Sequence, residues 1–470
     1  MKLIAQKISS VNLIKSTLVC LLSIVLLAYV FVPGVPAPIK LSFYLVIIIW
    51  SLILWDYLVL SRYSIAHGVV ITFVLLFYIL APLIQLTQDT EYLVNTMKLD
   101  ESIVIKTNLL IALFCVFYIL AYKLYQRNLT TKSGYSDLAL EFTFNRWLFG
   151  ILLAISVLAV PLAIKEAIGL VSNFSFLEEE SVDPLRLIRF KFFFMFPFVL
   201  ASYYLISRSK REQRSIFLIV VLILLVMATK NFILDRRNAL GPVYLSLVFF
   251  GWPRILKNNL RIFGFWVMVL VILFPLSSLL THAQFDNIGT VEEDFEFTEL
   301  IGSHFSDLHY DAWSNIPAAI DYTDKNGFQN GSQITGGLLF FVPRSIWNSK
   351  PNSSGQLLGD YLINSQFLWF NNISATIVLE GYLDFGVWGV LLFGAILGFS
   401  VVRLDVLLYS RNPFAKIFAV YAAVFLFYLM RGSLLTAIAY LSGAYMAIMI
   451  MPVLMKFFRL VNKTYFSQNQ

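Results

Sequence analysis

Apolar runs of about 20 residues recur along most of the chain, with short polar stretches between them. A run of that length crosses the roughly 30 Å hydrocarbon core of a bilayer as an α-helix, because a helix rises about 1.5 Å per residue. The runs lack the two-residue alternation of a transmembrane β-strand, so helices are expected. The pattern predicts about twelve spans, near residues 13–32, 41–60, 67–87, 103–122, 147–164, 190–207, 215–233, 239–252, 262–280, 387–407, 415–430 and 434–455.

Composition supports this pattern, since 59% of the 470 residues are apolar and only 13% are charged. A soluble domain carries about 25% charged residues. We therefore expect an all-α, polytopic integral membrane protein. Cys20 and Cys115 both lie in apolar runs and are interpreted as small core residues without a disulfide. The N-terminal run is interpreted as the first span and not as a cleaved signal.

Charge sets the predicted orientation. With the N-terminus inside, most of the 35 Lys and Arg residues fall in inside segments, and acids gather in outside loops such as Gln88–Glu101. Both termini are then cytoplasmic. The net charge of +7 follows from this topology and does not call for a nucleic-acid partner.

Three regions result from this topology. Residues 1–280 hold spans one to nine, residues 281–386 form one large outside loop, and residues 387–470 hold the last three spans and a tail. The loop is the one long polar segment of the chain, so the candidate chemistry is sought there.

Several basic residues lie on the predicted outside, against the usual rule. They come from separate parts of the chain: Arg186, Arg189, Lys191, Lys230, Arg236, Arg237, Arg344, Lys350 and Arg431. Any one of them is explained by snorkelling to lipid headgroups or by pairing with a nearby acid. Together they favour a phosphate site, because guanidinium groups bind phosphate oxygens bidentately.

The loop is predicted to begin with a helix over residues 298–322. Its apolar face carries Ile301, Phe305, Leu308 and Ala312, and an adjacent stripe carries His304, Asp307 and Asp311. Such a helix would lie on the membrane surface with a histidine and carboxylates along one edge. A solvated face with local ion pairs is the alternative interpretation.

Two later segments also bear candidate groups. An apolar stretch from Gly336 to Pro343 leads to Arg344 and is expected to be buried in protein. Glu380 and Asp384 lie one helical turn apart before the tenth predicted span. Each of these acids either faces a cavity or caps the start of that helix.

The sequence carries no phosphate-binding Walker loop, no dinucleotide glycine signature and no metal-binding His/Glu helix. No paired Asp-x-Asp pattern indicates a nucleotide-sugar site with a divalent metal. We therefore expect neither a metal nor a cofactor.

The segment Val342-Pro-Arg-Ser-Ile-Trp-Asn-Ser-Lys-Pro351, with Gly355 behind it, resembles the long-loop signature of the Wzy family of O-antigen and capsule repeat-unit polymerases. Glu380-Gly-Tyr-Leu-Asp-Phe-Gly386, the Arg236-Arg237 pair and the Arg-Gly-Ser turn at 431 look similar to that family as well. The resemblance covers layout and short motifs in the second half of the chain. No second arginine–glycine loop occurs in the stretch 164–189.

This resemblance implies a GT-C-like glycosyltransferase in the bacterial inner membrane with its large loop in the periplasm. It would transfer a growing glycan from undecaprenyl diphosphate to the non-reducing end of a new lipid-linked repeat unit, without metal, and a chain-length regulator is a possible partner. The implied diphosphate ligands are Arg236, Arg237, Arg344, Arg431, Lys350 and Arg189. The candidate bases are Asp307, His304, Asp311 and Glu380, and Trp347, Tyr310 and Trp313 are candidates for sugar stacking.

Two alternatives remain open. An O-antigen ligase shares the donor chemistry but transfers the glycan to lipid A core, and His304 and His309 are compatible with it. A lipid or polysaccharide transporter also fits twelve spans, although symmetric halves with discontinuous helices would then be expected.

Arg344→Ala is expected to abolish long polymer while the protein still inserts in the membrane, because the change removes a phosphate-binding fork from a polar loop. Arg344→Lys is expected to be impaired too, since a point charge does not replace a fork. The measurement is the length of surface glycan on a gel, with Lys257→Ala as the control that retains full length. Normal polymer from well-expressed Arg344→Ala protein would contradict the assignment.

Overall fold

The computed structural model is helical through the parts of the chain that it describes. These parts are residues 10–31, 34–89, 91–127, 144–172, 190–207, 215–235, 237–273, 304–306 and 308–467. Pairing between extended segments in these ranges is an isolated bridge of Tyr92 with Lys98. The all-α prediction is confirmed for the described residues.

Eight described helices are long and apolar enough to cross a membrane. They are built from α1 (Ser10–Tyr29), α2 (Ala37–Trp55) with η1 (Asp56–Leu60), α3 (Ile65–Phe73) with η2 (Val74–Leu80) and α4 (Ala81–Gln88), α5 (Glu101–Arg127), α7 (Arg146–Ser172), α18 (Ile377–Leu408), α19 (Pro413–Arg431) and α20 (Leu434–Ser467). The protein is therefore membrane-embedded by the length and composition of its helices.

Four shorter apolar helices fall where the other spans are predicted. They are α9 (Phe196–Ser207) after η3 (Phe193–Met195), α10 (Ile216–Thr229), α11 (Arg237–Gly251) and α12 (Asn259–Met268), which η6 (Val269–Leu273) continues. The count of twelve spans stays a prediction, because these four helices are short of a full crossing.

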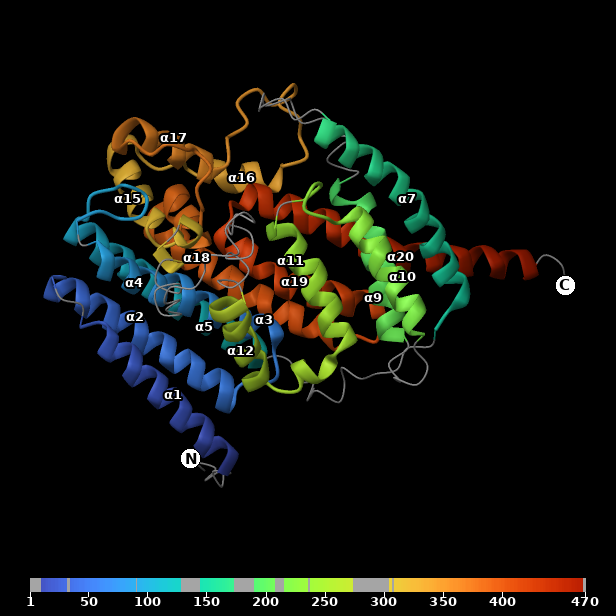
Figure 1. Ribbon diagram of the computed structural model, residues 1–470, viewed down its shortest axis with the longest axis horizontal. Coiled ribbons are helices and arrows are strands. Elements are labelled where there is room, and N and C mark those ends of the chain that lie inside the picture. Colours follow the sequence, from blue (N-terminus) through green and yellow to red (C-terminus); the bar gives the residue numbers. More distant parts are fainter. Residues whose placement is uncertain are drawn as a thin grey trace, which may run out of the picture.

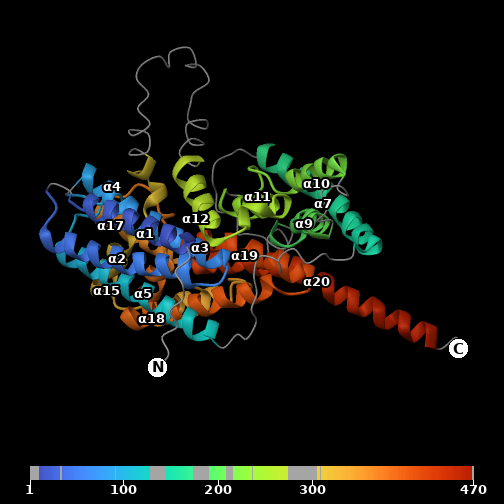
Figure 2. The same cartoon turned by 90° about the horizontal axis from the view of Figure 1, so that it is seen from below.

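The helices form two groups with α19 between them, and α20 starts near the centre and runs outward past the second group to the C-terminus (Figures 1 and 2). One group contains α1, α2, α5 and α18, and the other contains α7, α9, α10 and α11. A layer of short helices covers one end of the first group: η8 (Leu308–Tyr310), α15 (Asn315–Asn326), α16 (Ser332–Leu338) and α17 (Ser354–Gln366). We call this the loop layer.

The predicted single helix over 298–322 is wrong for the described residues. A short helix at 304–306 and η8 precede a turn, and α15 begins only at Asn315. Pro317 explains the break, since a proline is tolerated in the first turn of a helix, whereas inside a helix it clashes with the carbonyl four residues earlier. A surface position is wrong as well, because Trp313, Ile316 and Ile320 are fully buried.

The tenth predicted span also begins earlier than expected. Helix α18 starts at Ile377, ten residues before the predicted start at residue 387, so Glu380 and Asp384 are helical. The helix is kinked at Phe385 and Gly386, and Gly386 has a φ of +61°, which a glycine adopts at low cost. The kink thus falls at the predicted boundary between loop and span.

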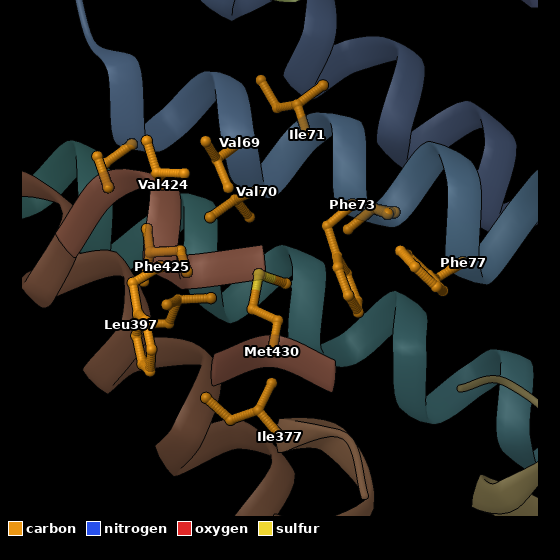
Figure 3. Packing of buried hydrophobic residues seen from close by; sticks show 14 of the residues in the cluster. Val69, Val70, Ile71, Phe73, Phe77, Ile377, Leu397, Val424, Phe425 and Met430 are labelled. Atoms are coloured by element: carbon orange, nitrogen blue, oxygen red, sulfur yellow. The ribbon is translucent and has the colours of Figure 1, made fainter. Parts of the chain in front are cut away.

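Close packing of α18 against α5 is central to the first group of helices. Gly394 and Gly398 lie one turn apart on α18, and a Cβ atom added at Gly394 would lie 2.7 Å from the Phe114 carbonyl oxygen of α5. One added at Gly398 would collide with the Tyr118 carbonyl oxygen. Small residues at this spacing let helix backbones approach closely in lipid. Apolar side chains of α3, α18 and α19, including Val70, Phe425 and Met430, fill the neighbouring core (Figure 3).

Gly398→Ala is therefore expected to force α18 and α5 apart and to lower the free energy of unfolding by about 1–3 kcal/mol. Thermal unfolding of the purified protein in detergent measures the effect. Gly150→Ala on α7 is the matched control, because a Cβ atom there meets nothing within 4 Å. Equal midpoints for the two variants would contradict the packing argument.

Candidate functional site

Arg431 lies where the loop layer meets the membrane helices. It is the last residue of α19, directly before the short turn into α20. Its Nη2 atom lies 3.5 Å from Oδ1 of Asp311, and its side chain is 24% exposed while that of Asp311 is 4% exposed. The guanidinium carbon lies 5.9 Å from the ring centre of Phe77. Arg431 is thus a partly reachable cation beside a buried carboxylate.

Asp311 is held in place through its other oxygen. Oδ2 accepts hydrogen bonds from the Asn315 side-chain amide at 2.9 Å and from the Ser374 backbone N–H at 3.0 Å. Among the residues that the structure describes, Oδ1 has no hydrogen-bond partner, and the same is true of Nε of Arg431. Buried polar atoms are normally satisfied, so an unsatisfied atom on each member of this ion pair indicates a place for a polar ligand.

His304 and Tyr310 complete this group of side chains. Nε2 of His304 lies 3.3 Å from the Tyr310 hydroxyl, and the Tyr310 ring stacks on Phe77 with the ring centres 5.2 Å apart. The Gln85 amide of α4 donates to the carbonyl oxygens of Phe305 and Tyr310 and thereby fixes this segment. Phe77 contacts both Tyr310 and Arg431. We call Phe77, His304, Tyr310, Asp311 and Arg431 the loop cluster.

Glu380 and Asp384 cap helices other than their own. Glu380 is buried, and its Oε1 accepts from the Leu434 backbone N–H at 2.8 Å, at the start of α20, and from the Ser354 hydroxyl. Asp384 accepts from the N–H groups of Gln333 and Ile334 at 3.1 and 2.9 Å, at the start of α16. These first N–H groups have no partner within their own helices, so each carboxylate satisfies donors that the helix leaves open. The predicted capping of their own helix is not observed, since Thr376 caps α18 and the two acids cap neighbouring helices instead.

Arg344 and Lys350 bind the backbone of their own loop. The Arg344 guanidinium donates to the Lys350 carbonyl at 2.7 Å and to the Asn352 side chain at 2.8 Å. The Lys350 ammonium donates to the carbonyls of Phe340 and Val342 at 2.6 and 2.9 Å. Partial burial, with the nearby Arg344 charge, lowers the pKa of Lys350. Both cations thus brace the loop that carries the sequence signature.

The predicted convergence of outside cations on one site is not seen in the described residues. Arg344 and Arg431 have separate sets of partners, and Arg344 is exposed. Arg189, Arg236 and Asp307 lie outside the described residues, as does the side chain of Arg237. For these four the predicted roles stay predictions.

The aromatic candidates differ in accessibility. Trp313 is fully buried and donates from its indole N–H to Asn108 of α5 at 2.9 Å, so its ring is part of the core. Tyr310 is buried in the loop cluster. Trp347 is half-buried and donates to Ser349, which leaves it as the predicted stacking residue with an accessible ring.

Sequence reasoning missed several contributors to the site, namely Phe77, Gln85, Ser354, Asn315 and Ser374. Apolar and neutral residues give no charge signal. The contacts of Phe77, Gln85 and Ser374 also join segments that are distant in sequence, whereas Asn315 bonds to Asp311 four positions away and Ser354 bonds to Glu380. Among the described residues, no group of three or more His, Cys, Asp or Glu side chains is arranged to hold a metal ion. The chemistry that the loop cluster offers is that of a guanidinium, a carboxylate and an imidazole.

Compared with family models, curated proteins and solved structures, the chain gives no match. Its function is therefore inferred from its own residues and geometry.

Asp311→Ala is expected to lower the free energy of unfolding by roughly 2–4 kcal/mol, because it removes two hydrogen bonds to a carboxylate and leaves Arg431 without its counter-charge. Denaturation in detergent monitored by circular dichroism provides the measurement. Asp324→Ala is the matched control in the same layer, since the contact that Asp324 makes with a described residue is an exposed 3.7 Å ion pair with Lys106. A loss no larger than the control's would show that Asp311 does not anchor the cluster.

Proposed function

We propose that this membrane protein polymerises lipid-linked glycan repeat units. A growing glycan leaves its polyprenyl diphosphate and is joined to the terminal sugar hydroxyl of another lipid-linked repeat. The transfer breaks one glycosidic bond to phosphate and forms one glycosidic bond to the acceptor oxygen. The hydroxyl proton passes to a base, and the diphosphate departs with the bonding electrons.

One observation supports this chemistry above the others, namely the loose pairing of Arg431 with Asp311. Charge-assisted hydrogen bonds are usually 2.7–2.9 Å long, roughly, whereas this contact measures 3.5 Å. Within the described part of the chain, neither Arg431 Nε nor Asp311 Oδ1 has a hydrogen-bond partner. A ligand that presents an anionic oxygen and a hydroxyl side by side would satisfy both atoms at once. A sugar diphosphate next to an acceptor sugar is such a ligand.

The roles of the residues follow from their bonding capacity. Arg431 is a donor only, so it stabilises negative charge that develops on the departing phosphate. Ionised Asp311 is an acceptor only, and its fixed Oδ2 leaves Oδ1 to take the proton of the hydroxyl. Asp311 thus moves ahead of Asp307 and Glu380 as the candidate base. His304 is linked to the cluster through Tyr310 and is the second candidate.

The ligase alternative keeps one specific observation in its favour. His304 is buried at the loop cluster, and a functional histidine in the long loop is what the resemblance implies for the ligases. The two activities differ in their acceptor, which is a lipid-linked repeat for the polymerase and lipid A core for the ligase. Deletion of the gene separates them, because a polymerase-deficient host displays single repeats whereas a ligase-deficient host displays no surface glycan.

In the deletion host, Arg431→Ala is expected to leave single-repeat glycan and to lower the rate of polymerisation by about 100-fold or more, the range seen when one donor to a developing anion is removed. Arg431→Lys is expected to retain part of the activity as a point charge. Gel analysis of surface glycan, with protein levels matched, measures both. Arg411→Ala, an exposed arginine in the turn before α19, is the control with normal polymer. A normal ladder from Arg431→Ala would refute the proposal.

A further inference from the structure

The segment that links α16 to α17 exposes apolar side chains. Together with Leu338, the last residue of α16, it presents Phe341 and Ile346, and the exposed fractions of the three are 61%, 67% and 78%. The apolar stretch from Gly336 to Pro343 was expected to be buried in protein, and this expectation is wrong for Leu338 and Phe341. We call Leu338, Phe341 and Ile346 the apolar tip. Exposed apolar side chains gathered in one short segment mark a surface that contacts a partner or a membrane.

The packing of α16 places the apolar tip at the level where a membrane helix begins. Gly337 of α16 lies on the first turn of α20, because a Cβ atom added there would be 3.5 Å from the backbone carbonyl carbon of Leu434 and 3.3 Å from the Ile438 side chain. Leu434 is the first residue of an apolar stretch long enough to span the membrane. Leu338 follows Gly337 directly in the chain. The tip therefore starts at the edge of the membrane-spanning region.

The segment supplies hydrogen-bond partners for its own irregular backbone. The Lys350 ammonium donates to the carbonyl oxygens of Phe340 and Val342. The Arg344 guanidinium donates to those of Lys350 and Pro351. Irregular backbone is tolerated near hydrocarbon only where its polar groups find partners within the protein. A loop surrounded by water has no such requirement, so this use of two cations favours a place at the lipid interface.

Charge in this part of the chain suits anionic phospholipid. Residues 326–359 contain Arg344 and Lys350 and no Asp or Glu. Basic residues beside exposed apolar side chains are typical of segments that lie in the headgroup region of anionic membranes. Helix α15 of the same layer differs, since its exposed residues include Asp324 and Lys325, which carry both signs of charge. The apolar tip and α15 thus present different chemistry, and the tip is the part that fits lipid.

We infer that the apolar tip is inserted in the phospholipid leaflet at the Leu434 end of α20, which is the outer leaflet in the predicted topology. Phe341 and Ile346 contact acyl chains there, and the two cations of the segment hold the loop in the shape that presents these side chains. The inference adds a lipid-binding surface and does not depend on the proposed function. Because Arg431 precedes Leu434 by three residues, the insertion keeps the loop cluster close to the membrane surface.

Photo-crosslinking tests the contact with lipid. A benzophenone amino acid replaces Ile346 in the apolar tip, or the exposed Asn364 of α17 as the polar control, or Leu224 of the apolar helix α10, which is 58% exposed, as the lipid-facing control. The full-length protein is irradiated in nanodiscs of phosphatidylethanolamine and phosphatidylglycerol. Mass spectrometry is expected to find phospholipid adducts at positions 346 and 224 and none at 364. A missing phospholipid adduct at 346, a protein adduct in its place, or equal yields at 346 and 364 would overturn the inference.

Limited digestion gives a second readout that does not depend on crosslinking chemistry. Arg344 lies between Phe341 and Ile346 in the chain, so trypsin reaches the bond after Arg344 only when the tip leaves the membrane. The double variant Phe341→Asp/Ile346→Asp is expected to be cut there at least about tenfold faster in the same nanodiscs, because charged side chains are costly in hydrocarbon.

Asn364→Asp on α17 is the matched control for this digestion, and its rate of cleavage after Arg344 is expected to equal that of the unchanged protein. Both variants alter exposed side chains, so their thermal midpoints are expected to stay unchanged and to show that the fold is kept. The rate is measured from the peptide that ends at Arg344. Equal rates for the double variant and the control would also overturn the inference.

Discussion

Two buried carboxylates of α18 tie the loop layer to the membrane helices. Glu380 satisfies the first N–H of α20, and Asp384 satisfies two N–H groups at the start of α16. An unpaired N–H at a buried helix end costs about 1–3 kcal/mol, so both helices are positioned by where α18 places these acids. Ser354, at the start of α17, bonds to the same Glu380. Three helix starts thus depend on one turn of α18.

This arrangement explains why the loop cluster has a fixed geometry. The turn from Arg431 to Leu434 is held at its far end by Glu380, while Asp311 is held by Asn315 and by the backbone just before α18. Because neighbouring residues hold Arg431 and Asp311 in position, the two side chains need not bond tightly to each other. Each therefore keeps hydrogen-bonding capacity for a ligand. Sites preorganised in this way lose little free energy to rearrangement when charge develops.

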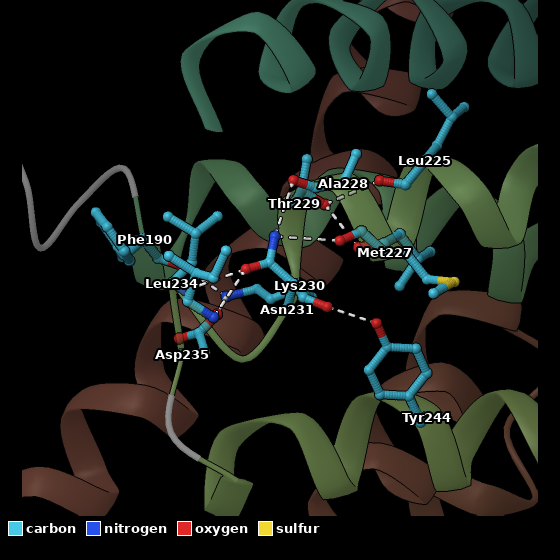
Figure 4. Close-up of polar contacts among 12 residues, drawn as sticks. Phe190, Leu225, Met227, Ala228, Thr229, Lys230, Asn231, Leu234, Asp235 and Tyr244 are labelled. Carbon is cyan, nitrogen blue, oxygen red and sulfur yellow. Dashed lines mark hydrogen bonds and ion pairs between the residues drawn. The ribbon is translucent and has the colours of Figure 1, made fainter. Parts of the chain in front are cut away.

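The described cations on the predicted outer side differ in how much hydrogen-bonding capacity their protein partners leave unused. Lys230 pairs with Asp235 and donates to the Phe190 carbonyl oxygen (Figure 4), and Arg344 and Lys350 donate to carbonyl oxygens of one loop. Contacts with neighbouring residues therefore account for the positions of these three cations on the predicted outer side. Arg431 differs, since it contacts a carboxylate loosely and retains an unsatisfied Nε. The positions of these charges in the sequence do not distinguish Arg431 from the other three cations.

The sequence by itself determined the helical class, the membrane embedding and the approximate places of the eight described helices that are long enough to span, because hydropathy is a property of local windows of about 20 residues. It also singled out Arg431, Asp311, His304 and Glu380 by residue type. Only the tertiary structure decided what these residues contact. The capping by Glu380 of a helix 54 positions away and the link from Gln85 to Tyr310, 225 positions apart, depend on packing between distant segments. No periodicity along the chain encodes such pairings, so the site emerges only when the loop layer folds onto the ends of α18, α19 and α20.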